Sequence, residues 1–159
     1  MHASIRLRTP LGGRALVDAA TGHRVPVITA TSLAQPGWLP AGARGPQNSP
    51  VEGWTRTYNF PTRNDRGLLL IVENPRSFAN PQEFSAQLGQ LTHLTVAGHP
   101  ATLLVQRRDG AIVEDEIGWH AGGYALIVKS TPLAAGRRPF SPSVLKRVAA
   151  SLSDPPTTN

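Results

Sequence analysis

The sequence predicts an α+β domain in which amphipathic helices pack on an antiparallel sheet of about six strands. The chain has 159 residues, of which 40% are hydrophobic, and this gives room for one compact core. From Gly53 onward, strand and helix patterns follow in the order two strands, helix, four strands, helix. Short turns join the strands, and short connections make neighbouring strands antiparallel.

Composition divides the chain into three parts. We expect a Pro/Gly-rich N-terminal segment with short strands, a folded α+β domain and a disordered tail, at residues 1–37, 38–152 and 153–159 respectively. Residues 21–24 separate two short apolar stretches of the first part and are typical of a turn. The density of Gly and Pro in residues 36–50 argues against a long regular element there.

Two strands open the predicted domain. Trp54, Tyr58 and Phe60 alternate with polar residues, which is typical of a half-buried strand. Residues 68–72 are an uninterrupted apolar run, and such a run suits a strand covered on both faces. The turn residues between these segments, 64–67, predict that the two strands pair as a hairpin.

The first helix is predicted to begin after Asn80. Asn80 is a favourable N-cap, Pro81 suits the first helical position, and the Glu83 side chain can reach back to the cap. The apolar face of this helix consists of Phe84, Leu88 and Leu91. Gly89 lowers its intrinsic helicity by about 1 kcal/mol relative to Ala, so packing on the sheet must hold it.

Four more strands and a second helix follow. Turn signals at residues 98–100, 109–110 and 121–123 divide the strands, which we place at residues 94–97, 101–107, 112–119 and 124–130. The second helix has Ser141 as N-cap and Pro142 at its first position. Its apolar face consists of Val144, Leu145, Val148, Ala149 and Leu152.

The basic residues do not form a recognisable patch. The 16 Lys and Arg exceed the 10 Asp and Glu and give a formal charge of +6, which favours acidic partners when the charge is concentrated on one face. The Arg residues are scattered along the chain, and the pairs at 107–108 and 137–138 lie beside turns. The scatter argues against nucleic acid as a partner.

Several kinds of catalytic site are missing from the sequence. The chain has no cysteine, which excludes disulfides, thiol nucleophiles and thiolate metal sites. Neither a glycine-rich phosphate loop nor an HExxH or GxSxG motif occurs. We therefore expect no enzyme activity, no cofactor and no metal. The N-terminus lacks the pattern of an export signal, so we expect any membrane tether to lie outside this chain.

The one dense charge run is acidic. In a strand, Glu114 and Glu116 point to one side and Asp115 to the other, so the two glutamates with His120 could serve as an acid/base or metal-dependent site. The favoured interpretation is that the glutamates form the solvent face of an exposed strand and discourage edge pairing, with His120 a solvated turn residue.

The aromatic residues on the predicted strands are the candidates for ligand binding. Trp54, Tyr58, Trp119 and Tyr124 could line an apolar pocket if they converge on one face of the sheet. The alternative is that they are ordinary core residues, because large aromatics dominate burial in small domains.

The order of several short motifs resembles a bacterial domain family of unknown function. These motifs are LPAG (39–42), W-x-R-x-Y (54–58), LLLIVE (68–73), LTVAGHPATLL (94–104), IGW with GGYALIVKST (117–131) and SPSVLKRVAASL (141–152). The family occurs in extracytoplasmic lipoproteins and in the outer parts of membrane-anchored proteins similar to anti-sigma factors, and it is distantly like the lipoprotein-carrier fold. The resemblance covers residues 38–152.

This resemblance implies a curved antiparallel sheet with both helices packed on its concave face, and a location outside the cytoplasm or in the cell envelope. It supplies no catalytic residues. We therefore expect a non-catalytic extracytoplasmic binding or sensor domain that recognises an apolar small molecule or a protein partner. The alternative function is a basic interaction module for nucleic acid or anionic surfaces, and an acid/base or metal-dependent enzyme is a third hypothesis.

Overall fold

The computed structural model describes residues 8–25, 34–49, 54–60, 68–75, 89–122, 124–131 and 140–153. The chain forms two compact units, Met1–Thr31 and Ser32–Asn159. In the first unit, β1 (Leu16–Val17) and β2 (Arg24–Val25) form a small antiparallel hairpin. Asp18 organises its turn, because the carboxylate accepts hydrogen bonds from the backbone N–H of Ala20 and the hydroxyl of Thr21, both at 2.9 Å.

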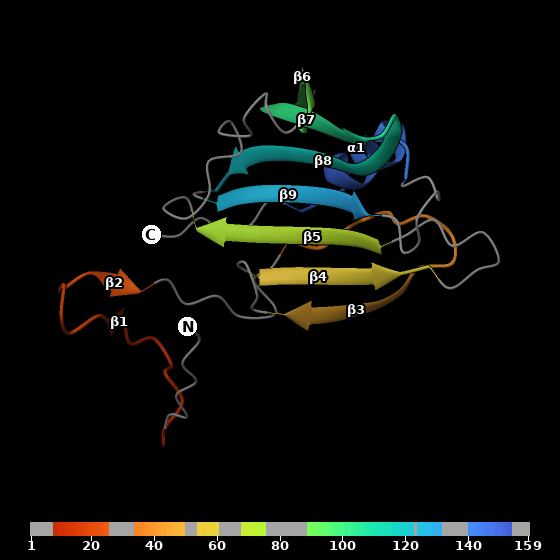
Figure 1. Cartoon of the computed structure of the whole chain (residues 1–159). Helices are drawn as coiled ribbons and strands as arrows, with labels where there is room; N and C mark the ends of the chain where they lie inside the picture. The colour runs from red at the N-terminus through yellow and green to blue at the C-terminus, as the bar shows by residue number, and fades with distance from the viewer. Residues whose placement is uncertain are drawn as a thin grey trace. The chain divides into compact units, whose positions relative to one another are not determined.

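The second unit is built on one seven-stranded antiparallel sheet. Its strands are β3 (Arg44–Ser49), β4 (Trp54–Asn59), β5 (Leu68–Pro75), β6 (Gln90–Val96), β7 (His99–Arg108), β8 (Ala111–Ala121) and β9 (Tyr124–Thr131). They lie side by side in the order β3-β4-β5-β9-β8-β7-β6 (Figure 1). The predicted hairpin of β4 and β5 is confirmed, with Tyr58 opposite Leu69.

The prediction of an α+β fold with two helices and six strands is wrong. The described residues contain seven strands in one sheet and a single short helix, α1 (Pro142–Ala150). The predicted first helix at Asn80 falls mostly outside the described residues, but Leu91, assigned to its apolar face, lies in β6 opposite Leu104. Gly89 has a different role from the one expected, since a Cβ there would collide with the carbonyl of Val105.

The additional strand is β3, which the sequence analysis passed over because of its Gly and Pro content. Among the described residues β3 is the end strand of the sheet, next to β4, and an end strand tolerates proline because one side of its backbone is not used for strand pairing. Its pairing with β4 shifts between Arg44 and Gln47, around the cis peptide bond that joins Gly45 to Pro46. Gly45 has φ +124°, and a Cβ there would lie 2.9 Å from the carbonyl oxygen of Thr57.

Helix α1 packs on one face of the sheet, where it contacts β8, β9 and β6 (Figure 1). Its predicted beginning is confirmed, with Ser141 as N-cap and Pro142 at the start of the helix. The helix buries Leu145, Val148 and Ala149. Just before it, the Phe140 ring meets Phe60 edge-on, with ring centroids 4.7 Å apart.

Two faces of the sheet can be distinguished from the register. The backbone N–H of Phe140 donates to the Ser130 hydroxyl at 2.8 Å, so the Ser130 side of β9 is the side on which α1 begins. We call this the α1 face; on β8 it carries Asp115, Ile117, Trp119 and Ala121. The opposite face carries Glu114, Glu116, Gly118 and His120 of the same strand.

The C-terminal end of α1 is held by residues 34–38. Pro36 forms an antiparallel bridge with Leu152, and the N–H of Gly37 donates to the carbonyl of Ser151 at 2.8 Å. A Cβ on Gly37 would lie only 3.0 Å from that same oxygen, so a larger residue here would force the carbonyl to move. The Arg147 guanidinium lies 4.0 Å from the ring centroid of Trp38, a cation–π contact on the helix surface.

Candidate functional site

The aromatic residues predicted to line a pocket do not all converge. Tyr58, Trp119 and Tyr124 are buried, and the register places them on the α1 face. Trp119 and Tyr124 lie on neighbouring strands, whereas Tyr58 is on β4, three strands from β8 and level with Asp115, which puts it about 20 Å from Trp119. The backbone of Trp54 pairs with Glu73, and its side chain lies outside the described residues.

Tyr58 belongs to a polar contact within the second unit. The buried Arg56 guanidinium donates to the side-chain oxygen of Gln35 at 2.9 Å and thereby joins β4 to the segment that holds α1. Burial raises the pKa of the Tyr58 phenol, and the charge of Arg56 and its hydrogen bond act in the opposite direction. These contacts account for the burial of Tyr58 and Arg56 by packing within the second unit.

A pocket of about 210 Å³ opens over β6, β7 and β8. Its middle row consists of Leu94, Ala101 and Trp119, which are cross-strand neighbours. Strand alternation directs the side chains of this row to the α1 face, so we infer that its backbone forms the floor of a pocket on the opposite face. The side chains around the floor come from His93, Pro100, Thr102 and His120, and Gly118 completes the lining.

The register explains why these residues meet. The turn of Ala97 and Gly98 sets Val96 opposite His99 and so places His93 opposite Thr102. Between β7 and β8 the register shifts at Gln106 and Arg107, which brings Gly118 opposite Thr102. Without this shift Ile117 would take that place, and a one-residue slip would exchange the two faces of β8. The glycine leaves an opening in the layer of side chains.

The two histidines of the pocket were not paired in the sequence analysis. The sequence predicts His120 as a solvated turn residue, whereas the structure places it on β8 and His93 on β6, the two strands that flank β7. Their α-carbons are about 12 Å apart, from two strand spacings and a two-residue offset. The turn signals at residues 98–100 and 109–110 predict the neighbouring strands, but the register shift has no evident sequence signal.

The acidic residues and His120 are spread along β8. Glu114 forms an ion pair with Lys129 at 2.9 Å and accepts a hydrogen bond from the Gln106 amide at 3.1 Å. Glu116 is buried on β8, which lies between β9 and β7, so its interpretation as the solvent face of an exposed strand is wrong. His120 is four residues from Glu116 along an extended strand, a distance of about 13 Å that prevents joint action.

Asp115 is the most perturbed acid among the described residues. Its side chain is 1% exposed on the α1 face, between Val105 and Ser130 of the adjacent strands. Burial raises its pKa to about 6, although the positive charge of Arg107 lowers it. Among the described residues, Oδ1 has no hydrogen-bond partner. Burial of this kind penalises the charged form of a carboxyl.

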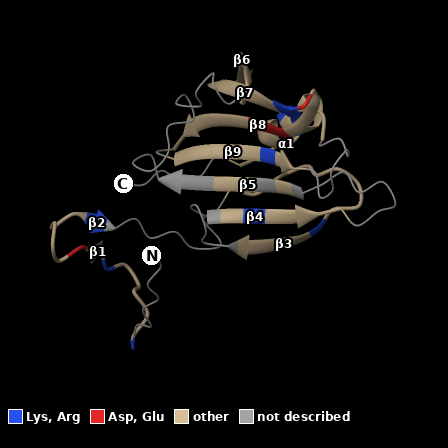
Figure 2. Ribbon diagram, viewed as in Figure 1, with Lys and Arg blue, Asp and Glu red and all other residues tan. Residues whose placement is uncertain are grey.

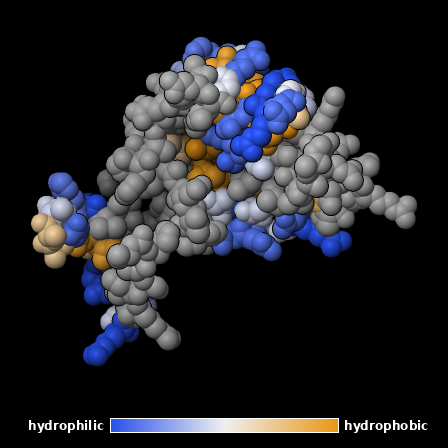
Figure 3. Space-filling view, viewed as in Figure 1, coloured by the Kyte–Doolittle hydropathy of each residue, from blue (hydrophilic) through white to orange (hydrophobic). Residues whose placement is uncertain are grey.

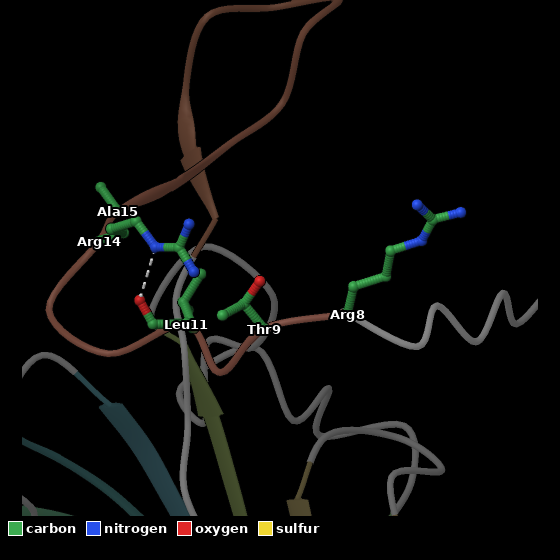
Figure 4. Close-up of a pocket in the computed structure, with 5 residues that line it drawn as sticks. All are labelled: Arg8, Thr9, Leu11, Arg14 and Ala15. Carbon is green, nitrogen blue, oxygen red and sulfur yellow. Dashed lines mark hydrogen bonds between the residues drawn. The ribbon is translucent and has the colours of Figure 1, made fainter.

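A second pocket lies in the N-terminal unit and has the character of an open loop. It has a volume of about 250 Å³ and is lined by Arg8, Thr9, Leu11, Arg14 and Ala15 (Figure 4). Arg14 closes the loop on itself by donating to the carbonyls of Leu11 and Pro10, at 3.1 and 2.6 Å. Figure 4 shows Arg8 extending away from the other lining residues. The pocket offers no converging groups for a ligand.

Charged groups in the second unit are distributed over several elements (Figure 2). Arg107, Arg108 and Asp109 are exposed at the turn between β7 and β8, where hydrophilic residues gather in Figure 3. Within the described ranges, no three His, Cys, Asp or Glu residues come together as a metal site. No helix in the described part of the chain is long and apolar enough to cross a membrane.

Comparisons with models of protein families, with curated proteins and with solved structures find no match to this chain.

Proposed function

We propose that this protein is a non-catalytic binding domain, and that the pocket over β6, β7 and β8 receives an apolar or aromatic side chain of a protein partner. The observation that carries the proposal is the opening at Gly118, which has no side chain and lies opposite Thr102 and two residues from His120. Backbone forms the floor, and the ring of Pro100 offers an apolar surface beside it.

The size of the pocket favours a side chain over a free metabolite. Small-molecule sites usually enclose about 300–1,000 Å³, and this pocket encloses about 210 Å³. The imidazoles of His93 and His120 and the hydroxyl of Thr102 can donate or accept hydrogen bonds at its rim. Such a rim suits a partner residue whose side chain enters the pocket while the backbone of the partner stays in water. The extracytoplasmic location stays a prediction from the family resemblance.

The alternative, a basic interaction module, has less support. Arg56 is buried, Lys129 is paired with Glu114, and Arg147 stacks on Trp38, so these three cations are engaged within the protein. Binding through phosphates would weaken steeply with salt. Retention of the chain on single- and double-stranded DNA, with a steep loss as salt rises, would favour this alternative over the pocket.

The pocket is tested by NMR titration with single-residue probes. We expect the N-acetyl amides of Phe, Trp and Leu to shift the backbone resonances of Thr102 and Gly118, and the amide of Glu to shift them less. His120→Ala removes a rim hydrogen-bonding group and should weaken the best probe about fivefold. His23→Ala, an exposed histidine in the other unit, is the matched control and should leave the binding unchanged.

Two results would overturn the pocket. One is the absence of any shift at Thr102 and Gly118 with all four probes. The other is equal binding by the wild-type protein and a correctly folded His120→Ala variant.

A further inference from the structure

β6 is the last strand of the sheet on the side beyond β7 (Figure 1). Ala97 and Gly98 join it to β7 with φ +47° and +84°, a two-residue turn of the primed type common in hairpins. In such a hairpin the flanking residues, Val96 and His99, exchange backbone hydrogen bonds. Because these pairs alternate along an antiparallel ladder, the backbone groups of Leu91, His93 and Thr95 point away from β7, toward the side on which no strand of the described residues pairs with β6.

The residues of β6 themselves lack the features by which an edge strand usually avoids pairing with other molecules. Proteins protect exposed edges with charges, prolines and bulges. β6 has the sequence QLTHLTV, without Asp, Glu, Lys, Arg or proline, and it pairs with β7 in one continuous register. The other end of the sheet is protected, because β3 carries Arg44, Pro46 and a register shift. The β3 edge therefore carries charge, proline and a register shift that discourage pairing, and β6 carries none of these.

We propose that β6 pairs antiparallel with β6 of a second copy of this chain, about a two-fold axis at His93. In this register His93 lies opposite itself, and Leu91 of each copy lies opposite Thr95 of the other. All three residues have outward-pointing backbone groups, so each of these cross-strand pairs exchanges two hydrogen bonds. The outward-pointing backbone groups are arranged symmetrically about His93. This symmetry favours a second copy of the chain as the strand that pairs with β6.

The side chains are compatible with this pairing. The opposed residues on the His93 side are Leu91 and Thr95, and on the α1 side they are Gln90 with Val96 and Thr92 with Leu94. None is Asp, Glu, Lys or Arg, so two chains that each carry a net charge of +6 meet through a segment free of these charges. Cross-strand pairs of this kind stabilise a sheet, whereas like charges directly opposite destabilise it.

The contact is small, and this determines its strength. A seven-residue strand is about 23 Å long, and the edge of one strand buries much less than the 1,200–2,000 Å² of a typical stable interface. We expect a weak dimer with a dissociation constant on the order of 100 µM, in the range of small interfaces.

Sedimentation velocity on the full chain tests the pairing, over a concentration series from on the order of 10 µM to about 1 mM. The wild-type protein should shift from monomer to dimer across the series. His93→Lys places like charges opposite each other and should weaken dimerisation by about fivefold or more. His93→Glu should do the same, and an equimolar mixture of the two variants should dimerise at least as well as the wild type.

The same charges placed elsewhere supply the control. Ala111→Lys and Ala111→Glu alter an exposed residue at the start of β8, so both variants should dimerise like the wild type. A wild-type chain that stays monomeric throughout the series overturns the proposal. So does a dimer that persists unchanged in both folded His93 variants, because its interface then lies elsewhere. The pocket is tested with a His120 variant at low concentration, so the two proposals can fail separately.

Discussion

Replacing Asp115 by Asn should stabilise the protein at neutral pH. Asp115 is buried on the α1 face, and its Oδ1 has no hydrogen-bond partner among the described residues. Asparagine has nearly the same shape and carries no charge at any pH. The substitution therefore removes the cost of ionising a carboxyl in an apolar environment, while the volume at this position stays the same.

The raised pKa sets the size of the effect. The pKa of Asp115 is raised from its ordinary value of 3.8 to about 6, and a shift of two units corresponds to about 3 kcal/mol. The folded state holds this proton more tightly than the unfolded state, so the contribution of Asp115 to stability is most favourable below pH 3.8 and is lost as pH rises to about 6. The variant should gain up to about 3 kcal/mol above pH 6 and nothing near pH 3.5.

Urea denaturation of both proteins at several pH values between 3.5 and 7.5 measures this difference. Comparing the variant with the wild type at each pH cancels the titration of the other acids. Asp109→Asn is the matched control, because Asp109 is exposed in a turn with φ +53°, a conformation that Asn accepts readily. If Asp115→Asn is destabilising at pH 7.5, the reasoning is refuted, since that result would mean that the ionised carboxylate is stabilised by its surroundings.

Two backbone substitutions should shift stability in opposite directions. Ala97→Asn should raise the melting temperature, with a gain of about 1 kcal/mol, because Ala97 has φ +47° and Asn-Gly is a preferred pair in this turn; a lower melting temperature contradicts the assigned turn. Gly37→Ala should lower the stability by about 1–2 kcal/mol, because its Cβ would press on the Ser151 carbonyl at 3.0 Å. Unchanged denaturant unfolding in this variant would contradict that close contact.

Local patterns predicted most strands but not their arrangement. The turn predicted at residues 109–110 and the start of α1 at Ser141 are confirmed, whereas the turn predicted at residues 98–100 lies at Ala97 and Gly98, with His99 and Pro100 in β7. The neighbours β5 and β9 are separated by about fifty residues of sequence, and nothing local specifies that Leu69 lies opposite Ser130. Only the apolar run of β5 indicates an interior position, and β5 lies between β4 and β9 with Leu69 and Ile71 buried.

The errors have physical causes at particular residues. Leu91 fits the apolar stripe of a helix, and it also fits a strand in which Leu104 lies opposite. For a short segment, periodicity alone cannot distinguish a helix from a strand. Gly89 was counted against helix stability, whereas its role is to let two backbones approach. Similarly, Gly and Pro in β3 were interpreted as loop signals, although an end strand accepts both. The pocket required the register shift between β7 and β8, which depends on tertiary packing.

The pocket and the β6 edge would act together in a dimer. Strand pairing uses backbone groups that lie in the plane of the sheet, whereas the pocket opens perpendicular to that plane, so pairing leaves the pocket accessible. A two-fold axis at His93 runs perpendicular to a continuous sheet and places both pockets on the same face. Each pocket is centred near β7, one and a half strand spacings from the axis, which separates the two by about 14 Å. Two weak sites at this distance could hold one partner segment much more tightly than either site alone, because the second contact is intramolecular.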